Sequence, residues 1–297
     1  MKMNRIQKLL SEIFQSLFSF VKIVLLSHFA VQIRKKDVAA SEVVILANGP
    51  GLKNDLLQSG SLIKENLKFC VNFFALSNEY QSLKPEYYIL AAPEFWLEKT
   101  SEYFRTQKES LITALLTKTD WKMNLFIPFQ AVDSEFHSAV KKNPNIKFIF
   151  YNNTPVEGLK SVSHLLFRVN LGMPRPHNVL IPSIFLALNL GFKKITLFGA
   201  DHSWHEEIKV DPLNKVTVNH EHFYDGEKIR MPMYKLEGEE YYIHDIFRKL
   251  HFAFKGYFVL KTYAESIGAS ILNGSNKSYI DAFERIISTD VPKKITD

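Results

Sequence analysis

Cysteine is almost absent from this sequence, because Cys70 is the only one among 297 residues. A single cysteine excludes an intramolecular disulfide, which suits a reducing compartment. Net charge is also nearly absent from most of the chain. The formal total is +6, but residues 1–40 hold seven basic and two acidic side chains, so the other 257 residues sum to only +1. A near-neutral body without a stripe of basic and aromatic residues argues against nucleic acid as the partner.

Proline and glycine are missing from residues 5–33, which predicts one long helix there. Its first half has apolar residues at helical spacing, and residues 17–26 are apolar almost all round. A spanning helix needs about 20 apolar residues, and Lys22 and His28 interrupt this run. A cleaved signal peptide would need a small-x-small site, which is poorly matched. A dimer or core helix is a further alternative. The pattern favours an interfacial amphipathic helix over residues 1–36, which would place the chain peripherally on the cytoplasmic face of a membrane.

Residues 37–297 alternate between apolar runs of strand length and helical stretches, and they contain no repeat or low-complexity tract. This rhythm predicts one α/β domain with a doubly wound, mostly parallel, Rossmann-like sheet. The irregular residues 203–240 are expected to form a lid-like insertion. The expected strands are 43–47, 68–72, 87–91, 124–127, 147–150, 194–198 and 270–272. The expected helices are 53–59, 94–117, 132–141, 178–190 and 241–266.

Two common phosphate-binding motifs are absent, namely the P-loop with Gly-Lys-Ser/Thr and the dinucleotide motif G-x-G-x-x-G. Instead, the first strand leads into Asn48-Gly49-Pro50-Gly51, here called the 48–51 turn, and then into a helix. Glycines let the backbone approach a ligand, and amides at a helix start favour an anion. Asn72 ends the next strand and is expected at the same sheet edge. The alternatives are a plain strand-to-helix turn and, for Asn72, a helix N-cap.

A third polar group follows the strand at 194–198, where Gly199, Ala200, Asp201 and His202 come in succession. Gly199 permits close approach, and Asp201 can bond a sugar hydroxyl or a metal. The histidine spacing matches no metal motif, so we predict no metal site. Upstream of the 178–190 helix, Arg175 is a candidate clamp for a phosphate or carboxylate and Asn178 is a candidate N-cap or ligand residue.

Histidine is concentrated in one part of the chain, since six of the ten lie within residues 202–251. A general base that works near neutral pH is most often histidine. We therefore expect one of the six to be catalytic, although surface histidines on a polar loop would give the same pattern.

Taken together, these segments resemble the bacterial CMP-sialic-acid sialyltransferases and the wider family of MptE-like, DUF115-type proteins of surface-polysaccharide synthesis. The 48–51 turn is similar to an Asn-Gly-Pro-Ser turn, with Gly51 in place of Ser, and Asn72 matches a nucleotide-contacting Asn. Arg175 and Asn178 look like an Arg and a Ser ahead of the central helix, and residues 198–203 look like a Ser-Gly-Ile-Asp-Phe-Tyr segment. Ala92-Pro93 stands where the family has Asn-Pro, so that contact is missing. Residues 273–275 and 278–283 also look like the surface-polysaccharide branch.

The resemblance implies a glycosyltransferase with a Rossmann-like fold of the GT-A-variant kind. Asn48, Gly49, Gly51, Asn72, Asn178, Gly199 and His202 would bind a nucleotide-sugar donor, for example a CMP-linked one carrying a sialic-acid-like or other nonulosonic acid. His222 or His244 would be the base, and Arg175 and Asp201 would assist. The acceptor would be a hydroxyl of a glycan or lipid-linked glycan in lipopolysaccharide or capsule synthesis, with no resident cofactor and with homo-oligomers an open question. One alternative is a pyrophosphokinase that uses ATP with Mg²⁺, and another is an inactive membrane scaffold.

Overall fold

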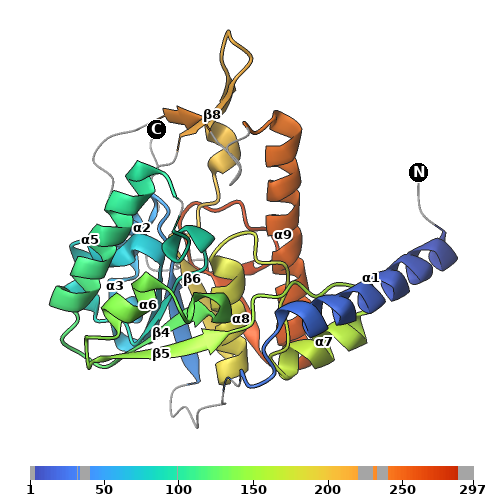
Figure 1. Ribbon diagram of the computed structural model, residues 1–297, viewed down its shortest axis with the longest axis horizontal. Coiled ribbons are helices and arrows are strands. Elements are labelled where there is room, and N and C mark those ends of the chain that lie inside the picture. The colour runs from blue at the N-terminus through green and yellow to red at the C-terminus, as the bar shows by residue number, and fades with distance from the viewer. Residues whose placement is uncertain are drawn as a thin grey trace, which may run out of the picture.

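The computed structural model describes residues 4–31, 33, 41–98, 100–219, 230–232 and 240–286. Its centre is an eight-stranded sheet in the order β11-β10-β6-β1-β2-β3-β4-β5, with every neighbouring pair parallel. Figure 1 shows this sheet surrounded by helices. The predicted α/β doubly wound fold is confirmed. The strands are β1 (Glu42–Leu46), β2 (Leu67–Val71), β3 (Tyr87–Ile89), β4 (Met123–Pro128), β5 (Ile146–Tyr151), β6 (Lys194–Phe198), β10 (Ser270–Asn273) and β11 (Glu284–Arg285).

The continuous apolar strands are explained by burial on both faces of the sheet. In β1, Val43 and Ile45 point into one core while Val44 and Leu46 point into the other. The first core is covered by α7 (Lys160–Arg168), α8 (Leu180–Leu190) and α9 (Ile243–Ser266), and α8 is buried along all its residues. The second is covered by α2 (Leu52–Gln58), α3 (Gly60–Glu65), α4 (Glu79–Leu83), α5 (Glu102–Lys118) and α6 (Glu135–Val140). Two covered faces are typical of a parallel sheet.

Three predicted segments differ from the structure. The helix expected over 94–117 begins only at Glu102, because Pro93–Phe95 forms a 3₁₀ turn (η2) and Ser101 caps α5 through its hydroxyl. The helix expected over 5–33 ends earlier, giving α1 (Arg5–Leu26). The residues expected to be an irregular lid contain a 3₁₀ turn, η4 (Trp204–Glu207), and an antiparallel sheet of β7 (Ile208–Val210), β8 (Val216–Asn219) and β9 (Arg230–Pro232). Within 203–240, residues 220–229 and 233–239 lie outside the described part of the chain.

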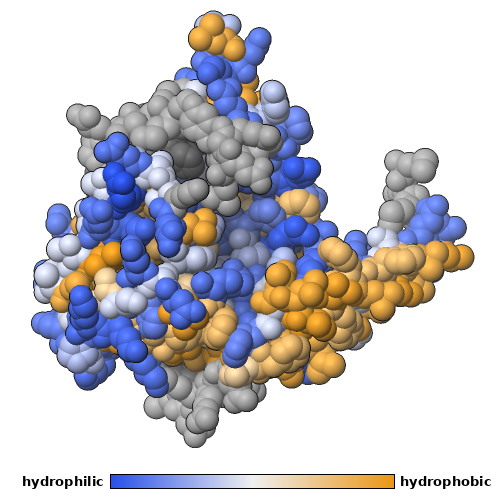
Figure 2. All heavy atoms as spheres, viewed as in Figure 1, coloured by the Kyte–Doolittle hydropathy of each residue, from blue (hydrophilic) through white to orange (hydrophobic). Residues whose placement is uncertain are grey.

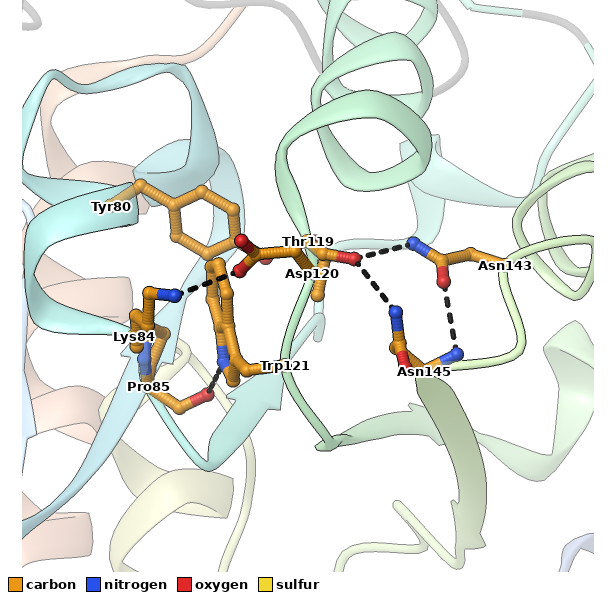
Figure 3. Close-up of polar contacts among 8 residues, drawn as sticks. All are labelled: Tyr80, Lys84, Pro85, Thr119, Asp120, Trp121, Asn143 and Asn145. Atoms are coloured by element: carbon orange, nitrogen blue, oxygen red, sulfur yellow. Dashed lines mark hydrogen bonds and ion pairs between the residues drawn. The ribbon is translucent and has the colours of Figure 1, made fainter.

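The amino ends of β3, β4 and β5 are joined by a dense hydrogen-bond network (Figure 3). The Asn143 amide donates to the carbonyls of Leu115 and Thr119, each at 3.0 Å, and its oxygen accepts from the Asn145 amide at 2.9 Å. Beside it, Trp121 Nε1 donates to the Pro85 carbonyl at 2.7 Å. The polar groups at this amino edge are therefore used in hydrogen bonds that stabilise the fold.

Candidate functional site

The carboxyl ends of β1 and β6 mark the point where the winding of the sheet reverses. The chain runs outward from β1 through β2 to β5 and then returns to β6 on the other side of β1. Ligands of open α/β sheets bind outside the carboxyl ends of the strands at such a switch point. The 48–51 turn follows β1 and residues 199–202 follow β6, so the structure brings these two predicted segments together. The Gly49 amide donates to the Gly199 carbonyl at 2.9 Å.

The glycines of the 48–51 turn are explained by the neighbouring Asp201 side chain. A Cβ on Gly49 would lie 1.9 Å from Asp201 Oδ2, and one on Gly51 would lie 2.2 Å from Asp201 Oδ1. The Gly51 amide donates to Asp201 Oδ2 at 3.1 Å. The turn is thus packed on a carboxylate of its own chain, and Asp201 acts as the support of the turn.

A second buried carboxylate, Asp55 in α2, lies behind Asp201. Its Oδ2 accepts from the Gly199 amide at 2.7 Å, and its Oδ1 accepts from the Asn276 amide at 2.8 Å. Burial raises the pKa of the Asp55 and Asp201 carboxyls, and the proximity of Asp55 raises the pKa of Asp201 further. Sequence reasoning missed Asp55, because an acidic residue in the first turn of a helix ordinarily signals only a favourable helix dipole.

The C-terminal segment 273–280, noted above for its family likeness, closes the other side of this cluster. Ser275 Oγ accepts from the Ala200 amide at 3.0 Å, and Ser278 Oγ donates to the Ala200 carbonyl at 2.6 Å. The Tyr279 amide donates to the Asp201 carbonyl at 2.9 Å. The backbone of residues 199–201 is therefore hydrogen-bonded to the 48–51 turn, to Asp55 and to residues 273–280. Together these groups form the floor of the candidate site.

Unpaired buried polar atoms gather along this carboxyl edge. Asn48 follows β1, Asn72 follows β2 and Glu94 follows β3, and each has a buried side-chain oxygen without a hydrogen-bond partner among the described residues. The Asn48 amide donates to the Val71 carbonyl at 3.1 Å, which aims its Oδ1 away from that bond. A buried oxygen without a donor costs about 1–3 kcal/mol, so such atoms are expected where a ligand supplies the donor.

Asn178 lies at the start of α8, which approaches the same edge. Its Oδ1 accepts from the amides of Leu180 and Ile181 at 2.9 and 3.2 Å and from the Tyr257 hydroxyl at 3.1 Å. Its Nδ2 is buried and has no partner in the described part of the chain. Asn178 therefore caps α8 while presenting a free N–H donor beside the helix N-terminus, where an anion is favoured.

His202 follows Asp201 in the chain and connects the end of β6 to α9. Its Nε2 is hydrogen-bonded to the Tyr257 hydroxyl, and its backbone has φ of 53°. Burial lowers the pKa of His202 to about 3, so the ring is neutral at physiological pH. His202, Tyr257 and Asn178 form one hydrogen-bonded chain that ties the end of β6 to the start of α8.

Arg175 does not point freely at the carboxyl edge as a clamp would. Its guanidinium pairs with the Glu157 carboxylate at 2.5 Å and lies 4.9 Å from the centre of the Phe252 ring. Burial alone would raise the pKa of Glu157, but Arg175 lowers it below its usual value. Arg175 Nε is buried and has no hydrogen-bond partner within the described ranges.

The structure does not bring the predicted base His244 to this cluster. His244 is exposed at the start of α9, thirteen residues before Tyr257, which corresponds to about 20 Å along the helix axis. His222 lies outside the described residues. In the ranges that the structure describes, no three His, Cys, Asp or Glu side chains are grouped as metal ligands would be.

Comparison with known proteins adds little to this picture. No family model and no curated protein matches the sequence. Among solved structures, the fold is similar to the MAf glycosyltransferase from Magnetospirillum magneticum AMB-1, with a TM-score of 0.48 and 13% sequence identity. The alignment covers 96% of this chain and 39% of that one, so this chain spans about two fifths of that structure's length.

Proposed function

We propose that this chain is a glycosyltransferase that binds a nucleotide-activated sugar at the carboxyl edge of the sheet and passes the sugar to a hydroxyl of a glycan acceptor. The observation that carries the proposal is the row of unpaired oxygens on Asn48, Asn72 and Glu94, which follow three adjacent strands at a switch point. A nucleoside offers the N–H and O–H donors that such a row requires.

The phosphate of the donor would bind at a second position, beside the start of α8. Asn178 Nδ2 offers an N–H group beside the positive end of α8. That group and the helix end would stabilise the negative charge that grows on the phosphate as the sugar leaves. The rigid floor formed by Asp201, Asp55 and residues 273–280 would hold the nucleotide in one orientation.

In the reaction, the acceptor oxygen forms a bond to the anomeric carbon while the bond from that carbon to the phosphate oxygen breaks. The electron pair leaves with the nucleotide, and the acceptor proton passes to a base. His222 or His244 remains our proposed base. His244 lies about 20 Å along α9 from Tyr257, so it can serve only if the start of α9 moves toward the carboxyl edge. The donor sugar, in this proposal, is a nonulosonic acid carried on CMP.

A thermal-shift screen of the full chain in mild detergent tests this proposal. The ligands are CMP, CDP, UDP, GDP and ATP, each with and without Mg²⁺. Stabilisation by CMP without metal is the expected result. A response to ATP with Mg²⁺ alone would replace the transferase by a pyrophosphokinase, and no response to any nucleotide would leave a scaffold without a nucleotide site.

A matched pair of variants ties the response to the proposed edge. Asn48→Ala removes an amide at the carboxyl edge, and Asn145→Ala removes one at the amino edge. We expect only Asn48→Ala to abolish the ligand-induced shift. Equal responses of the two variants would show that the nucleotide binds elsewhere.

A further inference from the structure

The amphipathic helix α1 is attached to the protein through its polar side. Ser16, Ser19 and Ile23 are its buried residues, and they share one stripe of the helix. Ser19 Oγ donates to the Glu157 carbonyl at 2.9 Å, and Ser16 Oγ accepts from the Leu159 amide at 2.9 Å. A Cβ on Gly158 would lie 2.3 Å from Ser16 Oγ, so the two backbones are in close contact. The attachment is therefore specific.

The apolar side of α1 faces away from the protein. Twelve large apolar side chains of α1 are exposed, with Leu25 at 73%, Val24 at 70% and Phe14 at 69%. Apart from Leu26, they fall within roughly half of the helix circumference. This is the reverse of an ordinary surface helix, which buries its apolar stripe in the core. Figure 2 shows the resulting apolar band along α1.

The band continues onto α7, which lies beneath α1 (Figures 1 and 2). Leu165 of α7 is 61% exposed and Val169, just after it, is 50% exposed. Exposed basic residues accompany both helices, namely Arg5 and Lys8 on α1 and Lys160 and Arg168 on α7. On these two helices the only acidic residue is Glu12, which lies 3.9 Å from Lys8. The surface is thus apolar, and both helices that carry it have a net positive charge.

A bilayer fits this surface better than a second protein copy does. A partner helix covers only a narrow stripe, about two positions in seven, whereas the exposed arc is about half of the circumference. A second copy would also bring two pairs of positively charged helices together. A membrane with anionic lipids covers the whole arc and complements the charge.

We propose that α1 and α7 together form a membrane-docking surface on which the protein lies with α1 in the plane of an anionic bilayer. This extends the membrane contact expected for residues 1–36 to α7 and fixes the orientation of the helix. It does not depend on the proposed transferase activity.

The attachment of α1 excludes a crossing orientation for the docked helix. The contacts from Ser16 to Ser27 run along about 16 Å of the helix, since Ser27 Oγ donates to the Leu171 carbonyl at 2.6 Å. If α1 crossed the bilayer, residues 152–159 and the Arg175–Glu157 ion pair would enter the hydrocarbon. Unpaired peptide groups and charges are strongly disfavoured there.

Vesicle co-sedimentation of the full chain tests the docking surface. Vesicles of phosphatidylcholine are compared with vesicles that also contain about 30 mol% phosphatidylglycerol. We expect clear binding to the anionic vesicles and weaker binding to the neutral ones. Phe14→Asp should weaken binding about tenfold or more, and Leu165→Asp about threefold to tenfold. Leu57→Asp, at a site on α2 that is 84% exposed, is the matched control and should bind as the parent does.

Probe depth distinguishes the in-plane from the crossing orientation. An environment-sensitive probe is attached to Leu10→Cys, Leu17→Cys or Val24→Cys, which lie on one face, while Cys70 is buried. Equal depths at the three positions support the proposal. A depth that changes by about 10 Å per seven residues would overturn it in favour of a crossing helix. If the protein does not bind vesicles and instead forms a dimer that Phe14→Asp dissociates, the proposal is overturned in favour of a protein interface.

Discussion

Replacing Gly51 by alanine tests whether the 48–51 turn is shaped by Asp201. The backbone of Gly51 has φ of −66° and ψ of −15°, which alanine adopts readily, so backbone strain is not expected. The new Cβ would lie 2.2 Å from Asp201 Oδ1 and would force the carboxylate away from the Gly51 amide. Overpacking of about 1–3 kcal/mol and the loss of a charge-assisted hydrogen bond predict a destabilisation of about 2–4 kcal/mol.

The double variant separates this cause from a general intolerance of the site. In an Asp201→Ala background the clashing atoms are gone, and Gly51→Ala should cost less than about 1 kcal/mol or slightly stabilise. Urea unfolding followed by tryptophan fluorescence gives the four free energies of unfolding and hence the coupling between the two positions. We expect a coupling of at least about 2 kcal/mol. Costs that add within about 0.5 kcal/mol would refute the reasoning.

Three further predictions concern stability and ligand selectivity. Asn143→Ala should lower the free energy of unfolding by about 2–3 kcal/mol, because the buried carbonyls of Leu115 and Thr119 lose their hydrogen-bond donor. Unchanged urea midpoints would contradict this. Lowering the pH from 7.5 to 5 should lower the free energy of unfolding by about 2 kcal/mol through His202. The pKa of His202 is about 3 in the folded protein and 6.5 in an unperturbed ring, so only the unfolded chain binds a proton there at pH 5. His202→Asn should remove that share, and an unchanged pH dependence would contradict the assignment. Glu94→Gln should weaken nucleotide binding about tenfold at unchanged stability and reduce the preference for ribonucleotides over 2′-deoxynucleotides; calorimetric titration showing no difference would exclude Glu94 from the site.

Most of the sheet was predictable because its inner strands are short apolar runs bounded by polar residues, and the predicted and observed bounds of β6 agree. The edge strand β11 was not predicted, because Glu284–Arg285 is short, charged and exposed. The breakdown of the helix predicted over 94–117 has a local cause. Pro93–Phe95 forms a 3₁₀ turn, and the helix restarts after the Ser101 cap. Helical spacing alone does not register such an interruption. The early end of α1 is explained by a tertiary contact. The His28 backbone amide donates to Asn152 Oδ1 at 2.8 Å instead of continuing the helix.

The site was predictable only in its outline. Parallel strands place their carboxyl ends at one edge, so Asn48, Asn72 and Asp201 were expected near one another. Whether a glycine faces a ligand or a neighbouring carboxylate depends on contacts about 150 residues apart, as between Gly51 and Asp201. Asp55 and Glu94 carried no sequence signal, because their importance comes from burial. Arg175 was expected as a clamp for a phosphate or carboxylate, but the sequence did not reveal its partner Glu157, which belongs to the loop that holds α1.

Substitution of Asn72 tests the central claim that the carboxyl edge holds a nucleotide. Asn72 has φ of 47°, a conformation that glycine adopts without strain, so Asn72→Gly removes the amide and keeps the backbone. Asn214→Gly is the matched control, because Asn214 has φ of 60° and lies in the exposed turn between β7 and β8. Titration calorimetry of the full chain with the nucleotide that gives the largest thermal shift should show affinity about tenfold weaker for Asn72→Gly and unchanged for Asn214→Gly. Equal affinities of both variants and the parent would contradict the account.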